Sequence, residues 1–396
     1  MSLNSPYDKL RSFVAVQGAG DQTEHLMDRG KKENQFITNK NSKIYMDLKD
    51  IIREHVLSFL PAKSLSRFRA VCRDWKLQIS TPFFAHNQSN GFHEISGFFC
   101  QSGSNPPSFI SLDPAAYGVP DPSLKFLPEP VDIRTSSNGL LCCQGLRGLN
   151  AYYICNPVTK QWKMLPKPNA SHGSDPALVL IFEPSVLNFV ADYKLICAFP
   201  SVDFDNGYEF EIYSSREGVW KVFGEIYFGN KKLLPRSGVH VNGIIYWQAT
   251  DGGIVVFDLV MERTQLLYGD YDSYNGYRSG TLGMMNGKLC LTKVHQPGLV
   301  VLVLSNAYKN TMQMRSNVKT WEQKHQICLS SSVLSGAASN DPNGRNVLFA
   351  GGNIILVRSG GKLYSYDMKT KAVQCLLDEL DQGARAVAYV NSLVEI

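Results

Sequence analysis

The pattern of apolar and polar residues changes twice along the chain. Residues 1–45 mix single apolar residues with polar runs such as DQTEHLMDRGKKENQ and show no sustained period. From Asp47 to about residue 86, apolar residues recur three and four positions apart, which is the spacing of one face of a helix. From Gly91 onward the period approaches two, as in β-strands. The pattern predicts a mobile extension, a short helical segment and a long β region.

The helical segment, residues 46–86, is predicted to hold three short helices. Asp47 is a suitable N-cap, and Pro61 ends the first helix because it lacks a backbone donor and clashes with the preceding turn. Further apolar residues follow at helical spacing as far as Ile79. Three helices in about 40 residues bury too little apolar surface to be stable alone. The segment is therefore expected to expose an apolar face that needs a partner.

The β region contains a loose repeat. Each unit has an Asn-Gly or Gly-Gly turn, an apolar strand, a gap, a strand that ends in Asn or Asp, and a strand with an aromatic residue or Leu. The units lie at residues 137–166, 192–223, 241–267, 285–324 and 351–376. No unit can bury both faces by itself, so radial repetition in a β-propeller is favoured. One or two β-sandwiches with coincidental hairpins are the alternative.

Seven prolines between Pro106 and Pro130 predict an irregular connection with edge strands at most. The predicted organisation is therefore an extension (1–45), a helical module (46–86), a proline-rich connection with the first edge strands (87–130) and a β-propeller (131–396).

Composition and charge support an all-β body that does not bind nucleic acid. The chain has 32 Gly, 19 Pro, 18 Tyr and 20 Phe, which suits many short strands joined by turns. The net charge is +5, but the surplus lies in residues 1–86, and residues 87–396 hold 26 basic and 26 acidic side chains. A nucleic-acid-binding body needs a basic stripe. The basic surplus of the helical segment is read as a solvated helix face.

Targeting signals and cysteines predict a location in the cytoplasm, the nucleus or both. The apolar runs are too short to cross a bilayer, and the N-terminus does not resemble a secretory signal, so neither membrane insertion nor secretion is expected. The nine cysteines have no C-x-x-C pair or framework spacing, so reduced core thiols are expected. Cys142 and Cys143, adjacent on a predicted strand, should point to opposite faces.

Residues 46–86 resemble the F-box. The resemblance rests on the spacing from Leu60-Pro61 through Leu65 and Arg67-Phe68-Arg69 to Val71-Cys72-Arg73 and Trp75. The segments CNPVTKQWKMLP (155–166), VNGIIYW (241–247) and IVVFDL (254–259) look like the kelch-type or F-box-associated domain of plant F-box proteins. The two resemblances follow each other in the order that this family uses.

The resemblance implies a substrate receptor of an SCF-type cullin-RING ubiquitin ligase. Such a protein docks on a Skp-type adaptor, reaches cullin and the RING protein through it, and holds a target protein for ubiquitination. It is not an enzyme and needs no cofactor or metal, because it acts by proximity. The adaptor-binding residues that it implies are Leu57, Leu60, Pro61, Leu65, Val71, Cys72 and Trp75.

Target binding is predicted on propeller loops, where recognition residues gather on a rigid scaffold. The first candidate is residues 269–280, where tyrosines recur every three positions beside an arginine; these residues are Tyr271, Tyr274, Tyr277 and Arg278. Tyrosine and arginine are frequent in interface hot spots. The alternative is that the tyrosines pack against neighbouring blades. A second candidate is the acidic loop 201–209, with Phe204 and Tyr208.

Three other functions stay open from the sequence. A propeller hydrolase would need catalytic residues scattered over several blades, because the sequence contains no G-x-S-x-G elbow, no phosphate-binding loop and no histidine pair at i and i+4. A lectin-like glycoprotein receptor would expose aromatic residues on a loop face. A transcriptional co-regulator would use the F-box outside the ligase.

Overall fold

The computed structural model describes residues 48–52, 56–147, 150–184, 191–229, 231–268, 271–272, 276–277, 280–295, 298–305, 321–328, 345–381 and 383–396. The chain divides into two compact units, residues 1–59 and 60–396. The described part of the first holds α2 (Leu48–Ile51) and the short 3-10 helix η2 (Leu57–Phe59). The predicted extension 1–45 and the predicted N-cap Asp47 lie outside the described residues.

The second unit begins with three helices, and the second and third are capped by the side chain of the residue in front of them. The three helices are α3 (Ala62–Phe68), α4 (Arg73–Ile79) and α5 (Pro82–Gly91). Before α4, the sulfur of Cys72 accepts a hydrogen bond from the Trp75 N–H at 3.5 Å. Before α5, the Thr81 hydroxyl accepts one from the Phe84 N–H at 3.2 Å, and proline fills the first helical position. These caps set the two turns between the helices.

The rest of the unit is β structure. Three sheets are four-stranded antiparallel meanders in chain order. They consist of β3 (Val131–Ser137), β4 (Leu140–Gly145), β5 (Tyr152–Asn156) and β6 (Gln161–Met164); β7 (Ala177–Phe182), β8 (Tyr193–Pro200), β9 (Gly207–Ser214) and β10 (Val219–Phe228); and β11 (Val239–Val241), β12 (Ile244–Gln248), β13 (Gly253–Asp258) and β14 (Arg263–Tyr268).

Two further meanders join through one parallel pair, Met284 with Gly351. They consist of β17 (Thr281–Met285), β18 (Lys288–His295), β19 (Gly298–Leu304) and β20 (Trp321–Cys328); and β21 (Arg345–Gly351), β22 (Ile354–Ser359), β23 (Lys362–Asp367) and β24 (Val373–Leu377). The last sheet has the order β2-β1-β25 and takes strands from distant parts of the chain. These strands are β1 (Ile95–Ser102), β2 (Ser108–Ser111) and β25 (Ala384–Val390).

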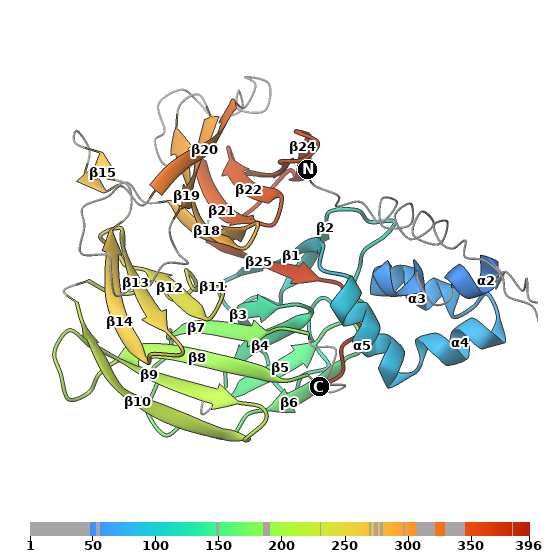
Figure 1. Ribbon diagram of the computed structural model, residues 1–396, viewed down its shortest axis with the longest axis horizontal. Helices are drawn as coiled ribbons and strands as arrows, with labels where there is room; N and C mark the ends of the chain where they lie inside the picture. The colour runs from blue at the N-terminus through green and yellow to red at the C-terminus, as the bar shows by residue number, and fades with distance from the viewer. Residues whose placement is uncertain are drawn as a thin grey trace, which may run out of the picture. The chain divides into compact units, whose positions relative to one another are not determined.

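The six groups of strands form a closed ring in the described part of the chain. The first strand of each group contacts the first strand of the next in the order β3, β7, β11, β17, β21, β25 and back to β3. The ring closes because β25 pairs with β1, as Figure 1 shows with β25 in red beside β1 in teal. This arrangement is a β-propeller and confirms the predicted fold class of a helical module followed by a large all-β domain.

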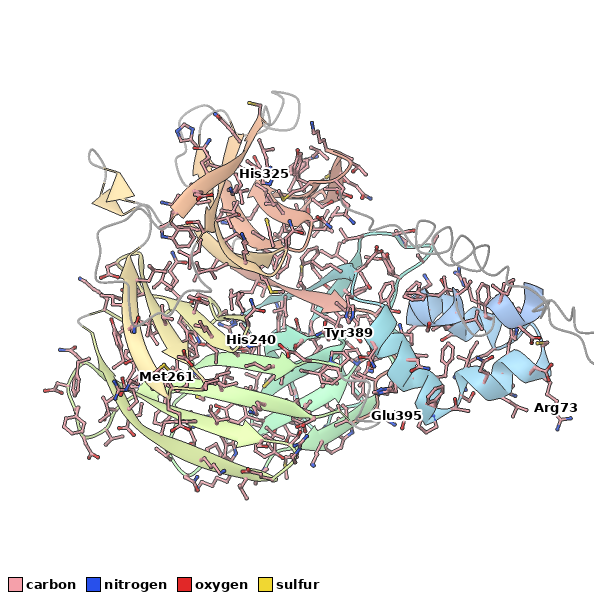
Figure 2. All side chains as sticks on the ribbon, in the orientation of Figure 1. Arg73, His240, Met261, His325, Tyr389 and Glu395 are labelled. Carbon is pink, nitrogen blue, oxygen red and sulfur yellow. The ribbon has the colours of Figure 1, made fainter. Side chains whose placement is uncertain are left out.

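Apolar clusters fill the spaces between neighbouring sheets. The cluster between the β3–β6 and β7–β10 sheets includes Cys142, Tyr193 and Trp220. The cluster between the β2-β1-β25 and β3–β6 sheets includes Cys143 and Tyr389, which Figure 2 labels on β25. The two adjacent cysteines therefore point to opposite faces of β4, as predicted. Each sheet is buried on both faces, which explains why one repeat cannot be stable alone.

Two kinds of turn recur in the repeats. The pairs Asn138-Gly139, Asn242-Gly243 and Asn286-Gly287 have positive φ at both residues and link the first strand of a sheet to the second. This is the backbone that two-residue hairpins need. At the end of the third strand, the side chains of Asp258 and Asp367 accept hydrogen bonds from backbone N–H groups two and three residues later. The predicted turn signals therefore mark real hairpins.

Candidate functional site

The residues that the F-box resemblance assigns to adaptor binding occupy different environments. Leu57, Pro61 and Leu65 are buried, and Leu60, Cys72 and Trp75 are partly buried. Val71, in the turn between α3 and α4, is 61% exposed. Their part in adaptor binding stays a prediction. In the free chain, Val71 is the one of the seven that presents most of its apolar surface to solvent.

Helices α4 and α5 each expose a large apolar residue that the sequence analysis did not assign to docking. Leu77 on α4 and Phe83 on α5 are each 61% exposed, as Val71 is. The signal that could have identified Leu77 is its position on the charged side of α4, one turn after Arg73 and Asp74. The side chain of Arg73, at the start of the same helix, points away from the helices in Figure 2. Large exposed apolar side chains next to basic residues suit a protein-binding surface.

Trp75 packs inward against the module. Its ring lies 5.5 Å from that of Phe68, and its indole N–H is buried without a hydrogen-bond partner among the described residues. Trp75 therefore contributes to the core that holds α3 against α4.

Helix α3 is tied to the loop that precedes the first blade. The ammonium group of Lys63 donates to the carbonyl oxygens of Pro114 and, at 3.1 Å, Tyr117. The guanidinium of Arg67 donates to the carbonyl of Ala115 at 2.9 Å. Backbone carbonyl groups of the proline-rich connection therefore accept the hydrogen bonds that attach α3 to it.

Helix α5 is tied to the end of β25 and the segment after it. The buried Gln88 side chain donates to the carbonyls of Leu60 and Asn391 and accepts from the Leu393 N–H at 2.9 Å. The Asn391 side chain accepts from the Lys63 N–H and donates to the Gly118 carbonyl at 2.8 Å. These contacts hold α3 and α5 on the propeller through directed hydrogen bonds.

The strands that lead into both predicted target-binding loops end at the same end of the propeller. We name this end the Asp132 end, because the innermost strand β3 begins there with Val131-Asp132. The other innermost strands run in the same direction and also begin there. The loop 201–206 links β8 to β9 there, because Ala177 at the start of β7 pairs with Ala198 near the end of β8. The loop 269–280 links β14 to the start of β17.

The described part of the 269–280 loop is a short hairpin. Its strands are β15 (Tyr271–Asp272) and β16 (Gly276–Tyr277), with Tyr271 opposite Tyr277. Tyr274 and Arg278 lie outside the described residues. The role of these four residues stays a prediction.

The second candidate loop exposes apolar side chains. Val202 is 86% exposed and Phe204 is 46% exposed. The ring of Phe204 packs edge-on against Phe228 of β10 at 5.7 Å, and Phe228 is itself 61% exposed. Asp203 and Asp205 flank this aromatic pair in the sequence. The Asp132 end therefore carries an apolar spot with acidic neighbours.

Five charged residues meet at the same end, and we name them the Asp132 cluster: Asp132, Arg134, Asp175, Arg236 and Arg385. Asp132 accepts hydrogen bonds from Arg134 at 3.1 Å, from Arg385 at 2.8 Å and from Arg236. The Asp175 carboxylate forms ion pairs with the guanidinium groups of Arg134 at 2.6 Å and of Arg236 at 3.4 Å. The residues come from β3, β25 and the segments just before β7 and β11, so the cluster links four of the six innermost strands.

A buried network lies between the β3–β6 and β7–β10 sheets. His172 Nε2 donates to Glu211 at 2.7 Å, and Asn169 donates to Glu211 through its side chain at 2.8 Å. Because Nε2 carries the proton, Nδ1 accepts from the Tyr152 hydroxyl at 3.0 Å. Burial would raise the pKa of Glu211, but hydrogen bonds from His172, Asn169 and Ala170 hold that pKa below its ordinary value. The network pins the segment 169–172 to β9.

Other chemistry-bearing groups are few within the described ranges. There, no three His, Cys, Asp or Glu side chains lie close enough to hold a metal ion. The described helices are also too short or too polar to span a membrane. All nine cysteines are free thiols, and burial raises the pKa of Cys100 and of Cys290 to about 12, so these thiols are weak nucleophiles.

A helical module with exposed apolar side chains, joined by hydrogen bonds to a propeller, defines a protein that combines a docking module with a recognition scaffold. The chain belongs to the family described as F-box protein At3g26010-like, beta-propeller, whose model matches residues 122–336. An F-box domain model matches residues 45–87. The predicted family, an F-box followed by an F-box-associated propeller, is confirmed.

Curated relatives from Arabidopsis thaliana carry the same kinds of name. The chain is 31% identical to F-box protein At5g07610 over 258 residues, 60% of each protein. It is 38% identical to F-box protein At5g49610 over 115 residues, 28% of this chain and 31% of that protein. It is 26% identical to putative F-box/kelch-repeat protein At1g15680 over 197 residues, 44% of this chain and 46% of that protein. The chain thus spans between 31% and 60% of the length of these relatives.

Proposed function

We propose that this protein is the substrate-recognition subunit of an SCF-type ubiquitin ligase. The F-box would dock on a Skp-type adaptor and, through it, on cullin and the RING protein. The propeller would hold a target protein near the ubiquitin-loaded enzyme, so that catalysis comes from proximity rather than from bond chemistry by this chain. The observation that carries the proposal is the match of an F-box model to residues 45–87 directly before a propeller.

The structure supports this role through the attachment between its parts. Hydrogen bonds of Gln88, Asn391 and Lys63 join α3 and α5 to the end of the propeller chain. A receptor gains from such attachment, since a fixed geometry raises the effective concentration of target lysines at the enzyme. The free thiols support a reducing compartment, and we place the protein in the cytoplasm, the nucleus or both.

The adaptor would contact the exposed apolar residues of the helices. Val71 and Leu77 are the best positions for a substitution that tests adaptor binding, because a charge can be placed there without disturbing a buried group. Substitution of the buried Pro61 or of Trp75 would change the module's core and its surface together.

The experiment is copurification of the tagged full chain with adaptor and cullin from plant cells. We expect the double variant Val71→Glu, Leu77→Glu to lower adaptor recovery by more than about tenfold, because interface hot spots contribute about 2 kcal/mol or more each. Val260→Glu is the matched control, because Val260 is 86% exposed in the turn between β13 and β14. Wild-type recovery by both variants, or no adaptor with the wild type, would refute the proposal.

A further inference from the structure

The Asp132 cluster carries more positive than negative charge. Its three guanidinium groups face two carboxylates in the described structure, which leaves one positive charge without a carboxylate. Arg385 also donates to the carbonyl of Gly103 at 3.1 Å, and Arg134 donates to that of Pro176 at 2.8 Å. Backbone carbonyls solvate a guanidinium but do not neutralise it.

The hydrogen-bonding capacity of the cluster is also incomplete. The Nε–H groups of Arg134 and Arg236 are buried and have no hydrogen-bond partner among the described residues. The Arg134 side chain is only 2% exposed, so it is held inside the cluster with an unused donor. Buried polar groups without partners are uncommon in folded proteins and call for an explanation such as a bound ion or ligand.

The electrostatics of Arg236 agree with this surplus. Burial, followed by the repulsion of the neighbouring Arg134 guanidinium, lowers the pKa of Arg236 to about 10, although Asp132 and Asp175 act in the opposite direction. Arg236 stays protonated at neutral pH. An additional negative charge beside it would be stabilised because it would offset the repulsion between the guanidinium groups.

The cluster can be reached from solvent. The side chains of Arg236, Arg385 and Asp175 are 21%, 30% and 53% exposed, whereas those of Asp132 and Arg134 lie beneath. It lies at the end of the propeller where the loop 201–206 also lies. A segment of a target protein lying across this end would meet both the loop 201–206 and the guanidinium groups.

We propose that the Asp132 cluster binds an anionic side chain, a carboxylate or a phosphoryl group, in a peptide segment of the target protein. This proposal rests on the proposed function, since it names the chemistry of the target that the propeller holds. Arginine is suited to this role because its planar donors match carboxylate and phosphate oxygens in pairs. Asp175, the most exposed carboxylate of the cluster, competes with the incoming anion for Arg134 and Arg236.

The test measures retention of degenerate peptide pools of about eight residues on the immobilised full chain. Four pools differ in a fixed central residue, which is glutamate, phosphoserine, glutamine or serine. We expect the wild type to retain the glutamate pool, the phosphoserine pool or both about tenfold more than the neutral pools. Comparison of the two anionic pools distinguishes a carboxylate from a phosphoryl group.

Two variants should act in opposite directions. Arg236→Gln should reduce retention of the anionic pools to the level of the neutral ones. Asp175→Asn should increase it, because the competing carboxylate is removed. Arg216→Gln is the matched control, because Arg216 pairs with Asp192 at 2.7 Å, is exposed and lies in the β9–β10 turn at the opposite end of the propeller.

A purely structural cluster gives a different result. Both variants would then lower the unfolding temperature and leave peptide retention unchanged, which would overturn the proposal, as would equal retention of all four pools by the wild type. Adaptor copurification of Arg236→Gln should match the wild type. The failure of this proposal is thus separate from the failure of the ligase assignment, which appears as no adaptor with the wild type or as undiminished adaptor with the Val71→Glu, Leu77→Glu variant.

Discussion

The side-chain amide of Gln88 on α5 donates a hydrogen bond to the backbone carbonyl of Asn391, 303 positions later in the chain, at 3.2 Å. The same side chain donates to Leu60 and accepts from Leu393, and it is fully buried. One glutamine therefore satisfies three backbone groups from two distant segments. The attachment of α5 to the propeller depends on it.

Gln88→Ala should lower the free energy of unfolding by about 2–4 kcal/mol, because buried backbone groups lose their partners and a cavity forms. Urea unfolding of the full chain measures this change. The control is Gln326→Ala, since Gln326 lies exposed on β20 and should change the free energy by less than about 0.5 kcal/mol. Equal effects of the two substitutions would show that the Gln88 contacts do not contribute to stability.

Alanine substitutions at Gly139 and Gly243 allow the cost of backbone strain to be distinguished from the cost of a steric clash. Both follow an asparagine in a two-residue turn between the first two strands of a sheet, with φ of 96° and 82°. A Cβ at position 139 would clash with the Ser392 side chain, whereas a Cβ at position 243 would meet open space. The two alanine variants therefore share the strain of a positive φ, and only one of them adds a clash.

We expect Gly243→Ala to cost about 1–2 kcal/mol and Gly139→Ala to cost more. The excess arises because the segment around Ser392 must move, and Asn156 holds that segment by donating to the Ser392 and Val394 carbonyls. Thermal unfolding of both variants checks the order. If Gly243→Ala were the more destabilising variant, the contact between the β3–β4 turn and the C-terminal segment would be of no energetic importance.

Glu211 should make stability depend on acid pH. Its pKa in the folded protein lies below the ordinary value of 4.5, so its charged form stabilises the fold above that value, and this contribution is lost as the pH falls through the folded pKa. Glu211→Gln should lower the free energy of unfolding by about 2 kcal/mol or more near neutral pH, because a charged group with several hydrogen bonds is replaced.

The difference between the wild type and Glu211→Gln should be larger at about pH 6 than at about pH 3. Denaturant unfolding at both pH values measures it. Glu217→Gln provides the control, because Glu217 is exposed and pairs with Lys221 on the surface, where an ion pair contributes little. A difference that stays constant with pH would mean that Glu211 is not held below its ordinary pKa.

Local chemistry made the repeats predictable. Asn-Gly pairs adopt positive φ at low cost, and aspartate or asparagine at the end of a strand accepts hydrogen bonds from the next turn, so both signals act without distant contacts. The predicted units nevertheless begin one strand late. The innermost strand β3 is rich in polar residues, and β11 has only three residues. An alternation of apolar and polar residues was therefore not distinguishable from the turns before these strands.

The sixth sheet was not predicted, for a physical reason. Its inner strand β25 comes from the end of the described chain, and its partners β1 and β2 come from the segment after the helices. Such a sheet has no internal repeat and no hairpin that would mark it. Pairing between distant segments is decided by ring closure, which removes two exposed sheet edges.

The candidate sites likewise include features that the sequence predicts and features that appear only in the structure. The sequence identified the F-box spacing and the loops 201–209 and 269–280, but it did not show that Leu57 and Leu65 are buried while Val71 and Leu77 are exposed. It also did not reveal the Asp132 cluster, whose five residues are scattered between positions 132 and 385. No local pattern marks residues that meet only when four inner strands lie side by side.

The sequence by itself determined the helical module, the repeating hairpins and the family, because helical periodicity, turn chemistry and motif spacing are local properties. Only the tertiary structure decided how the ring closes, which apolar side chains face solvent and where the charged residues gather. These features depend on contacts between segments far apart in the chain, and their energies arise from burial and charge proximity that exist only after the propeller has closed.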